Sequence, residues 1–83
     1  MEAVILGYGS IGKRHIANLS ELGVDIFGVY DPGILRNPMV SPRYAELGDE
    51  WCEFVRGRIV VIASPTRYHT DQLQAALKNG AVG

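Results

Sequence analysis

The chain has 83 residues, 47% of them hydrophobic, and eight Lys and Arg against nine Asp and Glu give a formal net charge of −1. This length forms one small domain, in the range where folding buries only about 60% of the unfolded chain's surface. The even charge balance, with no block of like charge, argues against nucleic acid and anionic membranes as partners. We therefore expect a single domain over residues 1–83 that binds a small molecule or another protein.

Cysteine content and hydropathy exclude several further classes. Cys52 is the single cysteine, so no internal disulfide can form, and it has no CxxC or Cys/His neighbour that would make a metal site. The longest apolar run, residues 59–63, is far too short to span a bilayer. The N-terminus lacks the basic start of a signal peptide. A soluble, cytoplasmic protein without a metal is expected.

The N-terminal residues predict a strand and then a helix. Residues 3–6 form a short apolar run bounded by glycine, which is typical of a buried strand in a parallel sheet. From Ser10 the apolar spacing becomes helical, and Gly23 is placed to end the helix. The inner face of this helix is expected to carry Ile11, His15, Asn18 or Leu19, and Leu22. His15 would then be a buried, hydrogen-bonded packing residue.

A second strand is predicted over residues 26–30, where another apolar run ends in the turn sequence Asp31-Pro32-Gly33. Strand, helix and strand in this order form a βαβ unit, whose crossover is almost always right-handed. Residues 33–45 are rich in proline and glycine and are expected to be mostly loop.

The second half of the chain predicts a further strand between two helices. Residues 45–55 have a weak helical pattern, and residues 58–63, RIVVIA, give the clearest strand signal. After the turn at residues 64–66, a helix ends at Gly80, and residues 81–83 begin another element. The shared face of the first helix would carry Leu47, Trp51, Phe54 and Val55, and that of the second Leu73, Ala76 and Leu77. The whole pattern predicts an α/β, Rossmann-like three-layer fold with a parallel sheet of three to four strands, truncated before its last strands.

The glycine pattern of the first turn suggests a binding site. Gly7, Gly9 and Gly12 form a GxGxxG motif between the first strand and the first helix. In such a motif the first glycine makes a tight turn, the second lets the backbone approach a pyrophosphate, and the third lets the helix pack closely on the strand. The helix directs its free N–H groups and its positive dipole end at the phosphates. A dinucleotide is the ligand that this arrangement favours.

Asp31 supports that interpretation and indicates which dinucleotide binds. It ends the second strand 19 residues after Gly12, close to the roughly 20 expected for a carboxylate that binds the adenosine ribose. Its charge would repel the 2′-phosphate of NADP, so NAD is favoured. Asp31 also has an alternative role as an ordinary turn former. Arg36 could pair with a 2′-phosphate, which keeps NADP open, although it is more simply a solvated loop arginine.

A methyltransferase is the alternative reading of the glycine turn, since such enzymes also have glycines after the first strand and an acid after the second. Their glycine loops usually follow an acid, and here that position is Leu6. A methyltransferase is therefore less favoured than a dinucleotide-binding protein.

Three segments together resemble one family. GYGSIGKRH at 7–15, VYD at 29–31 and IASPTRYH at 62–69, followed by ALKNG at 76–80, are similar to the N-terminal Rossmann domain of the glucose–fructose oxidoreductase and inositol dehydrogenase family (Gfo/Idh/MocA). The resemblance implies that the domain binds NAD(P) and that its parent protein transfers hydride to or from a sugar, nucleotide sugar or polyol. It also implies a set of cofactor-binding residues: Gly7, Gly9, Ser10, Ile11 and Gly12 at the pyrophosphate, Asp31 at the ribose, and Ser64, Pro65, Thr66 and His69 beside the nicotinamide half.

The resemblance also implies what these 83 residues lack. Family members continue into a strand that ends in Glu-Lys-Pro, whose lysine is an active-site residue, and then into a large α/β domain, and neither is present in this sequence. We expect no catalytic residue in this chain and no turnover by the chain alone. Residues 58–63 would form an exposed sheet edge and promote self-association. A small, non-catalytic nucleotide-binding or regulatory module is the alternative function.

Overall fold

The computed structural model describes residues 1–31 and 45–83. Arg36 and all of the expected loop except Ala45 lie outside the described residues. The described elements, in chain order, are β1 (Glu2–Leu6), α1 (Ser10–Glu21), β2 (Asp25–Tyr30), β3 (Ala45–Leu47), the 3-10 helix η2 (Asp49–Phe54), β4 (Ile59–Ile62), the 3-10 turn η3 (Thr66–Tyr68) and α2 (His69–Lys78).

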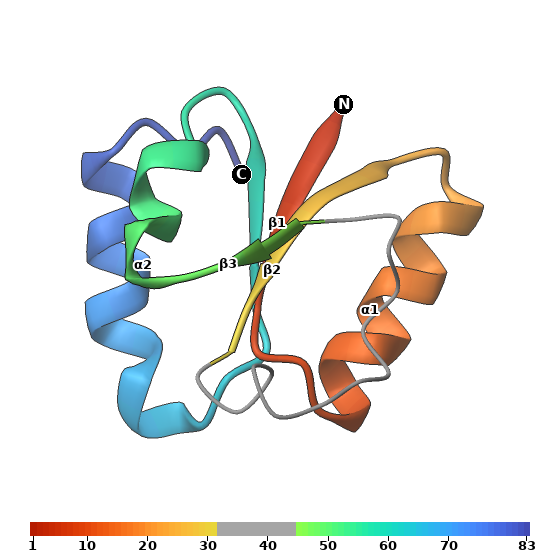
Figure 1. Ribbon diagram of the computed structural model, residues 1–83, viewed down its shortest axis with the longest axis horizontal. Coiled ribbons are helices and arrows are strands. Elements are labelled where there is room, and N and C mark those ends of the chain that lie inside the picture. Colours follow the sequence, from red (N-terminus) through yellow and green to blue (C-terminus); the bar gives the residue numbers. More distant parts are fainter. Residues whose placement is uncertain (32–44) are drawn as a thin grey trace.

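The sheet is parallel and has helices on both faces. Its four strands lie in the order β3-β2-β1-β4, and each neighbouring pair runs parallel. Helix α1 covers one face, while η2 and α2 cover the other (Figure 1). These layers confirm the predicted Rossmann-like α/β fold with a parallel sheet.

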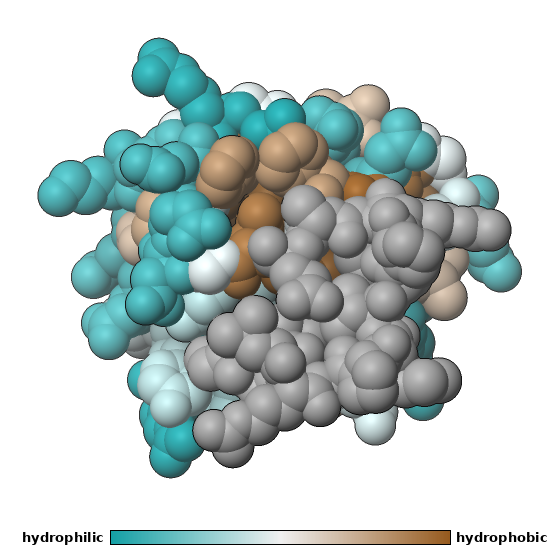
Figure 2. Space-filling model, viewed as in Figure 1, coloured by the Kyte–Doolittle hydropathy of each residue, from teal (hydrophilic) through white to brown (hydrophobic). Residues whose placement is uncertain are grey.

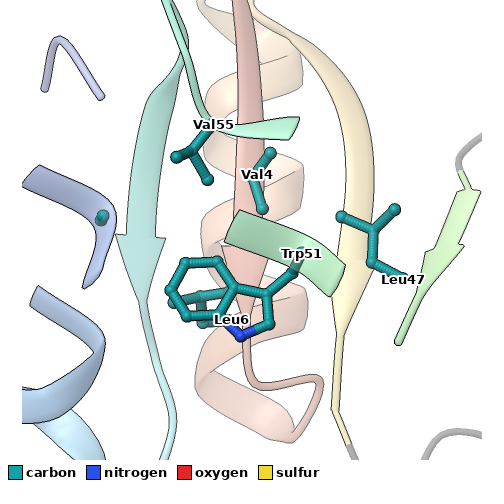
Figure 3. Packing of buried hydrophobic residues seen from close by; sticks show 6 residues of the cluster. Val4, Leu6, Leu47, Trp51 and Val55 are labelled. Atoms are coloured by element: carbon teal, nitrogen blue, oxygen red, sulfur yellow. The ribbon is translucent and has the colours of Figure 1, made fainter. Parts of the chain in front are cut away.

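Strand β1 lies at the centre of the core because both of its faces are covered. Successive side chains of a strand point to opposite faces, and the four apolar residues 3–6 are all fully buried. Ala3 and Ile5 pack with Val29 on the α1 side. Val4 and Leu6 pack with residues of η2 and α2 on the other side (Figure 3). This double burial explains why the first strand is a continuous apolar run without polar alternation.

Residues 45–55 correct the sequence prediction of a helix. The structure has a short strand, β3, and then the 3-10 helix η2. The packing face was predicted correctly, since Leu47, Trp51 and Val55 are buried in one cluster (Figure 3). The element type differs because residues 45–47 pair with the outer edge of β2. Leu47 then occupies the space beside Gly28, where a Cβ atom would lie 2.8 Å from the Leu47 Cδ1.

The inward face of α1 also differs from the prediction. Ile11 and Leu22 are 62% and 78% exposed, and His15 is exposed rather than buried and packed. The residues that face the sheet are Gly12, Ile16 and Leu19. The physical reason is the contact of Gly12 with the first turn, which fixes the rotation of the helix so that positions i, i+4 and i+7 from Gly12 point inward.

Helix α2 approaches the sheet through small residues. Ala76 is buried and Ala75 packs against the same cluster, whereas Leu73 and Leu77 are 50% and 64% exposed. The prediction that both leucines line the inner face was therefore wrong. Gly80 follows the helix with φ +92°, in the left-handed region that favours glycine at a helix end.

The outer edge of β4 is partly covered by the last residues of the chain. The Val82 amide donates to the Arg58 carbonyl at 2.9 Å, and the Val60 amide donates to the Gly83 carbonyl at 2.7 Å. Among the described residues no strand flanks β4 on this side. The expected open edge is therefore open over only part of its length.

Polar residues dominate the outer flanks of the molecule as seen in Figure 2, and apolar surface shows between them. Across residues 1–31 and 45–83, no helix has the length and apolar character needed to cross a membrane. Cys52 is a free cysteine, and burial raises the pKa of its thiol, which keeps it in its less reactive protonated form at neutral pH.

Arg58 joins three elements, β1, β2 and η2, near the end of the sheet where the strands begin. Its Nε and one terminal nitrogen lie 3.2 and 3.1 Å from the Glu2 Oε1. Another terminal nitrogen donates to the Phe54 carbonyl at 2.7 Å, and the guanidinium stacks 3.8 Å from the centroid of the Phe27 ring. Most of the stabilisation is expected from the ring contact and the carbonyl bond, because exposed ion pairs contribute little.

We predict that Arg58→Met lowers the free energy of unfolding by about 2 kcal/mol, because it removes the cation–π contact and leaves the Phe54 carbonyl without this donor. Urea unfolding of the variant and the native chain measures the difference. Arg14→Met is the matched control, since Arg14 is exposed on α1, and should change stability by less than about 0.5 kcal/mol. Equal effects of the two substitutions would contradict the role assigned to Arg58.

Candidate functional site

A groove of about 680 Å³ lies where the carboxyl ends of β1, β2 and β4 meet, and these strand ends point to the lower edge of Figure 1. It contains every residue that the sequence singled out for cofactor binding except Gly12, which is buried behind it. The lining residues are Gly7, Gly9, Ser10, Ile11, Asp31, Ile62, Ala63, Ser64, Pro65, Thr66 and His69. Ile62 and Ala63 were not predicted, and they line the groove because β4 ends there.

Gly7 and Gly12 make the tight turn between β1 and α1 possible. Gly7 has φ +104°, and a Cβ atom there would lie 2.7 Å from the Ser64 amide nitrogen. A Cβ atom at Gly12 would lie 2.1 Å from the carbonyl oxygen of Gly7. Any side chain at these two positions would separate the glycine turn from the residues that follow β4, or from the helix itself.

Gly9 differs from the other two glycines because a Cβ atom there would meet nothing within 4 Å. It forms the N-cap of α1 in an extended conformation, and no side chain caps the helix. The first turn of α1 also holds no acidic residue. The helix N-terminus that faces the groove therefore presents backbone N–H groups without a capping side chain or an acidic residue. This suits an anionic group such as a phosphate.

The Asp31 carboxylate lies directly beside the glycine turn. Its Oδ2 accepts a 2.8 Å hydrogen bond from the backbone N–H of Tyr8. Gly7 N–H also donates to the carbonyl of Tyr30, the residue before Asp31, at 2.8 Å. Two bonds therefore hold the turn after β1 against the end of β2, and they place a negative charge at a defined position in the groove.

A smaller cavity of about 300 Å³ adjoins the groove and shares four of its residues, Gly7, Asp31, Ser64 and Pro65. Its other lining residues are Tyr30, Tyr68 and Gln72, which sequence reasoning did not select. Tyr30 ends the predicted second strand, and Tyr68 and Gln72 follow the predicted SPT turn. Their position near the carboxyl ends of predicted strands is the sequence feature that could have identified them.

Tyr30 forms a fixed wall of this smaller cavity. Its hydroxyl donates to the Asp49 Oδ1 at 3.1 Å, and its ring lies 6.2 Å from that of Trp51. Burial, and then the hydrogen bond to Asp49, raise the pKa of the Tyr30 phenol. The phenol therefore stays neutral at physiological pH and presents an aromatic surface without a charge.

Ser64 follows β4 and is held by two side chains of α2. The His69 Nε2 lies 2.6 Å from the Ser64 carbonyl oxygen, and the Ser64 hydroxyl hydrogen-bonds to the Gln72 Oε1. No group of three His, Cys, Asp or Glu side chains that could hold a metal ion occurs within residues 1–31 and 45–83. Among the described residues, the site thus combines backbone donors, the Asp31 carboxylate and the polar side chains of Ser64, Thr66, His69 and Gln72.

Comparison with known proteins places this arrangement in context. Residues 1–82 match the family described as oxidoreductase family, NAD-binding Rossmann fold (GFO_IDH_MocA). Among solved structures, the chain is similar to apo scyllo-inositol dehydrogenase from Lactobacillus casei, with a TM-score of 0.68 and 22% sequence identity. The match covers 98% of this chain and 26% of that one, so the chain spans about a quarter of that dehydrogenase. A comparison with curated proteins found no match.

We predict that Gly12→Ala lowers the free energy of unfolding by about 3 kcal/mol, because the new methyl group collides with the Gly7 carbonyl. Gly9→Ala is the matched control in the same turn, where a methyl group meets no protein atom, and it should cost less than about 0.5 kcal/mol. Urea or thermal unfolding followed by circular dichroism measures both. Similar losses for the two variants would mean that the close packing at Gly12 is not what the turn requires.

Proposed function

The chain belongs to the Gfo/Idh/MocA oxidoreductase family with an NAD-binding Rossmann fold, and from this premise we propose that its groove binds NAD in preference to NADP. The observation that carries the proposal is the meeting of three features in one groove. These are a glycine turn that no side chain obstructs, an uncapped helix N-terminus, and the carboxylate of Asp31. Together they suit a pyrophosphate linked to a ribose.

In this proposal the pyrophosphate lies over Gly9, Ser10 and Ile11 at the start of α1. Gly7 and Gly12 act indirectly, since they allow the turn and the helix to take their positions. The open space in front of Gly9 supports a close approach of ligand to backbone. N–H groups and the helix dipole would supply the complementary charge, and no lysine or arginine is among the described residues that line the groove.

Asp31 would accept hydrogen bonds from the hydroxyls of the adenosine ribose. Its carboxylate would repel a 2′-phosphate in the same place, which favours NAD over NADP. Ser64, Pro65, Thr66 and His69 also line the groove, and they would then lie toward the nicotinamide half. Bound NAD would supply a hydride acceptor, and this chain's residues would bind and orient it.

We propose that the parent oxidoreductase acts on a sugar, a nucleotide sugar or a polyol. The similar structure is that of a scyllo-inositol dehydrogenase, which supports a polyhydroxylated substrate. Hydride transfer also needs groups that hold the substrate hydroxyl within hydrogen-bond reach and move its proton. We assign no residue of this chain to that role, and we place the protein in the cytoplasm.

We predict that NAD at a hundredfold excess over its Kd raises the melting temperature by about 10 to 20 °C, since it stabilises the folded state by about 2.7 kcal/mol. The shifts given by NADP and by S-adenosylmethionine under the same conditions should be clearly smaller. A larger shift with S-adenosylmethionine than with NAD would overturn the proposal and favour a methyltransferase-like site.

Asp31→Asn tests the ribose assignment. Asparagine keeps an acceptor for the Tyr8 N–H but loses the charge, so NAD should bind about tenfold more weakly. NADP binding should hold or improve, because the repulsion of its 2′-phosphate is removed. Calorimetric titration measures both constants, and Glu21→Gln at the far end of α1 is the control. Unchanged preference between the two dinucleotides would refute the assignment.

Self-association through residues 58–63 is the remaining proposal about partners. The unflanked part of β4 supports it, since the last residues cover only the positions near Arg58 and Val60. Light scattering at micromolar concentration should give a mass above that of a monomer. A strictly monomeric mass over a tenfold range of concentration would contradict this proposal.

A further inference from the structure

Ser64 is one of the four residues that the two cavities share. It lines both the large groove and the smaller cavity. The two side chains that hold it line different cavities, since His69 lines the large groove and Gln72 lines the smaller cavity. Both belong to the first turns of α2. Ser64 is therefore attached to α2 through two side chains.

The chemistry of the two bonds fixes which atom donates. A backbone carbonyl can only accept, so the 2.6 Å contact with the Ser64 oxygen requires that the His69 Nε2 carries the hydrogen. In the neutral ring Nδ1 is then the acceptor. The Ser64 hydroxyl donates to the Gln72 Oε1, so the two bonds use different atoms of Ser64 and do not compete.

We propose that His69 is a positioning residue, which holds the Ser64 carbonyl and so keeps the turn at residues 64–66 in place against the large groove. This assignment rests on the proposed dinucleotide binding and deepens it. His69 acts through Ser64 and needs no contact of its own with the ligand. Gly7 packs against the same turn, because a Cβ atom there would reach the Ser64 amide. A shift of Ser64 would therefore disturb both the turn at residues 64–66 and the glycine turn at Gly7, which line the groove.

The two cavities make the effect selective. When His69 is lost, Ser64 is still held by Gln72 on the side of the smaller cavity, beside Asp31. A ligand confined to the Asp31 side should then be affected little, whereas one that extends along the turn should lose affinity. AMP and NAD are suitable probes, because NAD contains AMP and continues beyond it.

The test measures calorimetric Kd values of NAD and AMP for the 83-residue chain and three variants. We expect His69→Ala to weaken NAD about tenfold and AMP less than twofold. His69→Gln should restore NAD to within about threefold, because its amide nitrogen can donate to the same carbonyl. His15→Ala changes the chain's other histidine, which is exposed on α1, and should leave both constants unchanged.

A ligand-independent measurement examines the bond itself. The ¹H–¹⁵N spectrum of the imidazole rings at neutral pH should show His69 as the Nε2–H tautomer, and addition of NAD should not change it. An Nδ1–H tautomer would overturn the proposal. A direct hydrogen bond from the ring to the cofactor would instead change the His69 tautomer or protonation state on addition of NAD, and would leave His69→Gln as weak as His69→Ala.

The outcomes separate this inference from the proposed function. If the native chain binds neither NAD nor AMP, the proposed function fails and the role of His69 fails with it. If the native chain binds NAD and His69→Ala binds it equally well, this inference alone is overturned, whether or not the variant's melting temperature has fallen.

Discussion

The close contact between Gly12 and the Gly7 carbonyl is the constraint on which the rest of the structure depends. A hydrogen is the only side chain that fits there, since a Cβ atom would lie 2.1 Å from the oxygen. The contact brings the start of α1 against the end of β1 and sets the rotation of the helix. That rotation turns Ile16 and Leu19 toward the sheet and leaves the helix N-terminus facing the groove. Both the core packing and the candidate anion site thus depend on the absence of a side chain at Gly12.

The order of the strands explains why the site lies where it does. β1 pairs with β2 on one side and with β4 on the other, so the chain leaves β1 in one direction and later returns to its opposite flank. In parallel sheets a crevice opens at such a reversal, beyond the carboxyl ends of the strands. The glycine turn, Asp31 and Ser64 follow three different strands, yet Gly7, Asp31 and Ser64 all line both cavities. The topology brings together residues that are far apart in the sequence.

Sequence reasoning predicted the strands and the groove better than it predicted the helix faces. A buried strand or a glycine turn is encoded locally, by an apolar run or by a motif whose spacing has a single steric explanation. A helix face depends on what lies opposite. Ile11, Leu73 and Leu77 have the right spacing and the right chemistry for burial, but they are exposed, because α1 and α2 approach the sheet through Gly12 and Ala76. The spacing of apolar residues does not reveal where a small residue lets a helix approach the sheet closely.

The dependence on residues from elsewhere in the chain also explains why β3 was not predicted. Residues 45–47 adopt a strand because the outer edge of β2 offers them hydrogen bonds and Gly28 leaves room for Leu47, and neither feature is visible in residues 45–55 alone. At the carboxyl end of β2, the bond from the Tyr8 amide to Asp31 ties the glycine turn to that strand. That bond orients the carboxylate through protein contacts, independently of any ligand. Binding to an acceptor that is already oriented costs less conformational entropy than binding to an acceptor that must first be ordered. The site is therefore preformed at Asp31, because folding itself orders this carboxylate before any ligand binds.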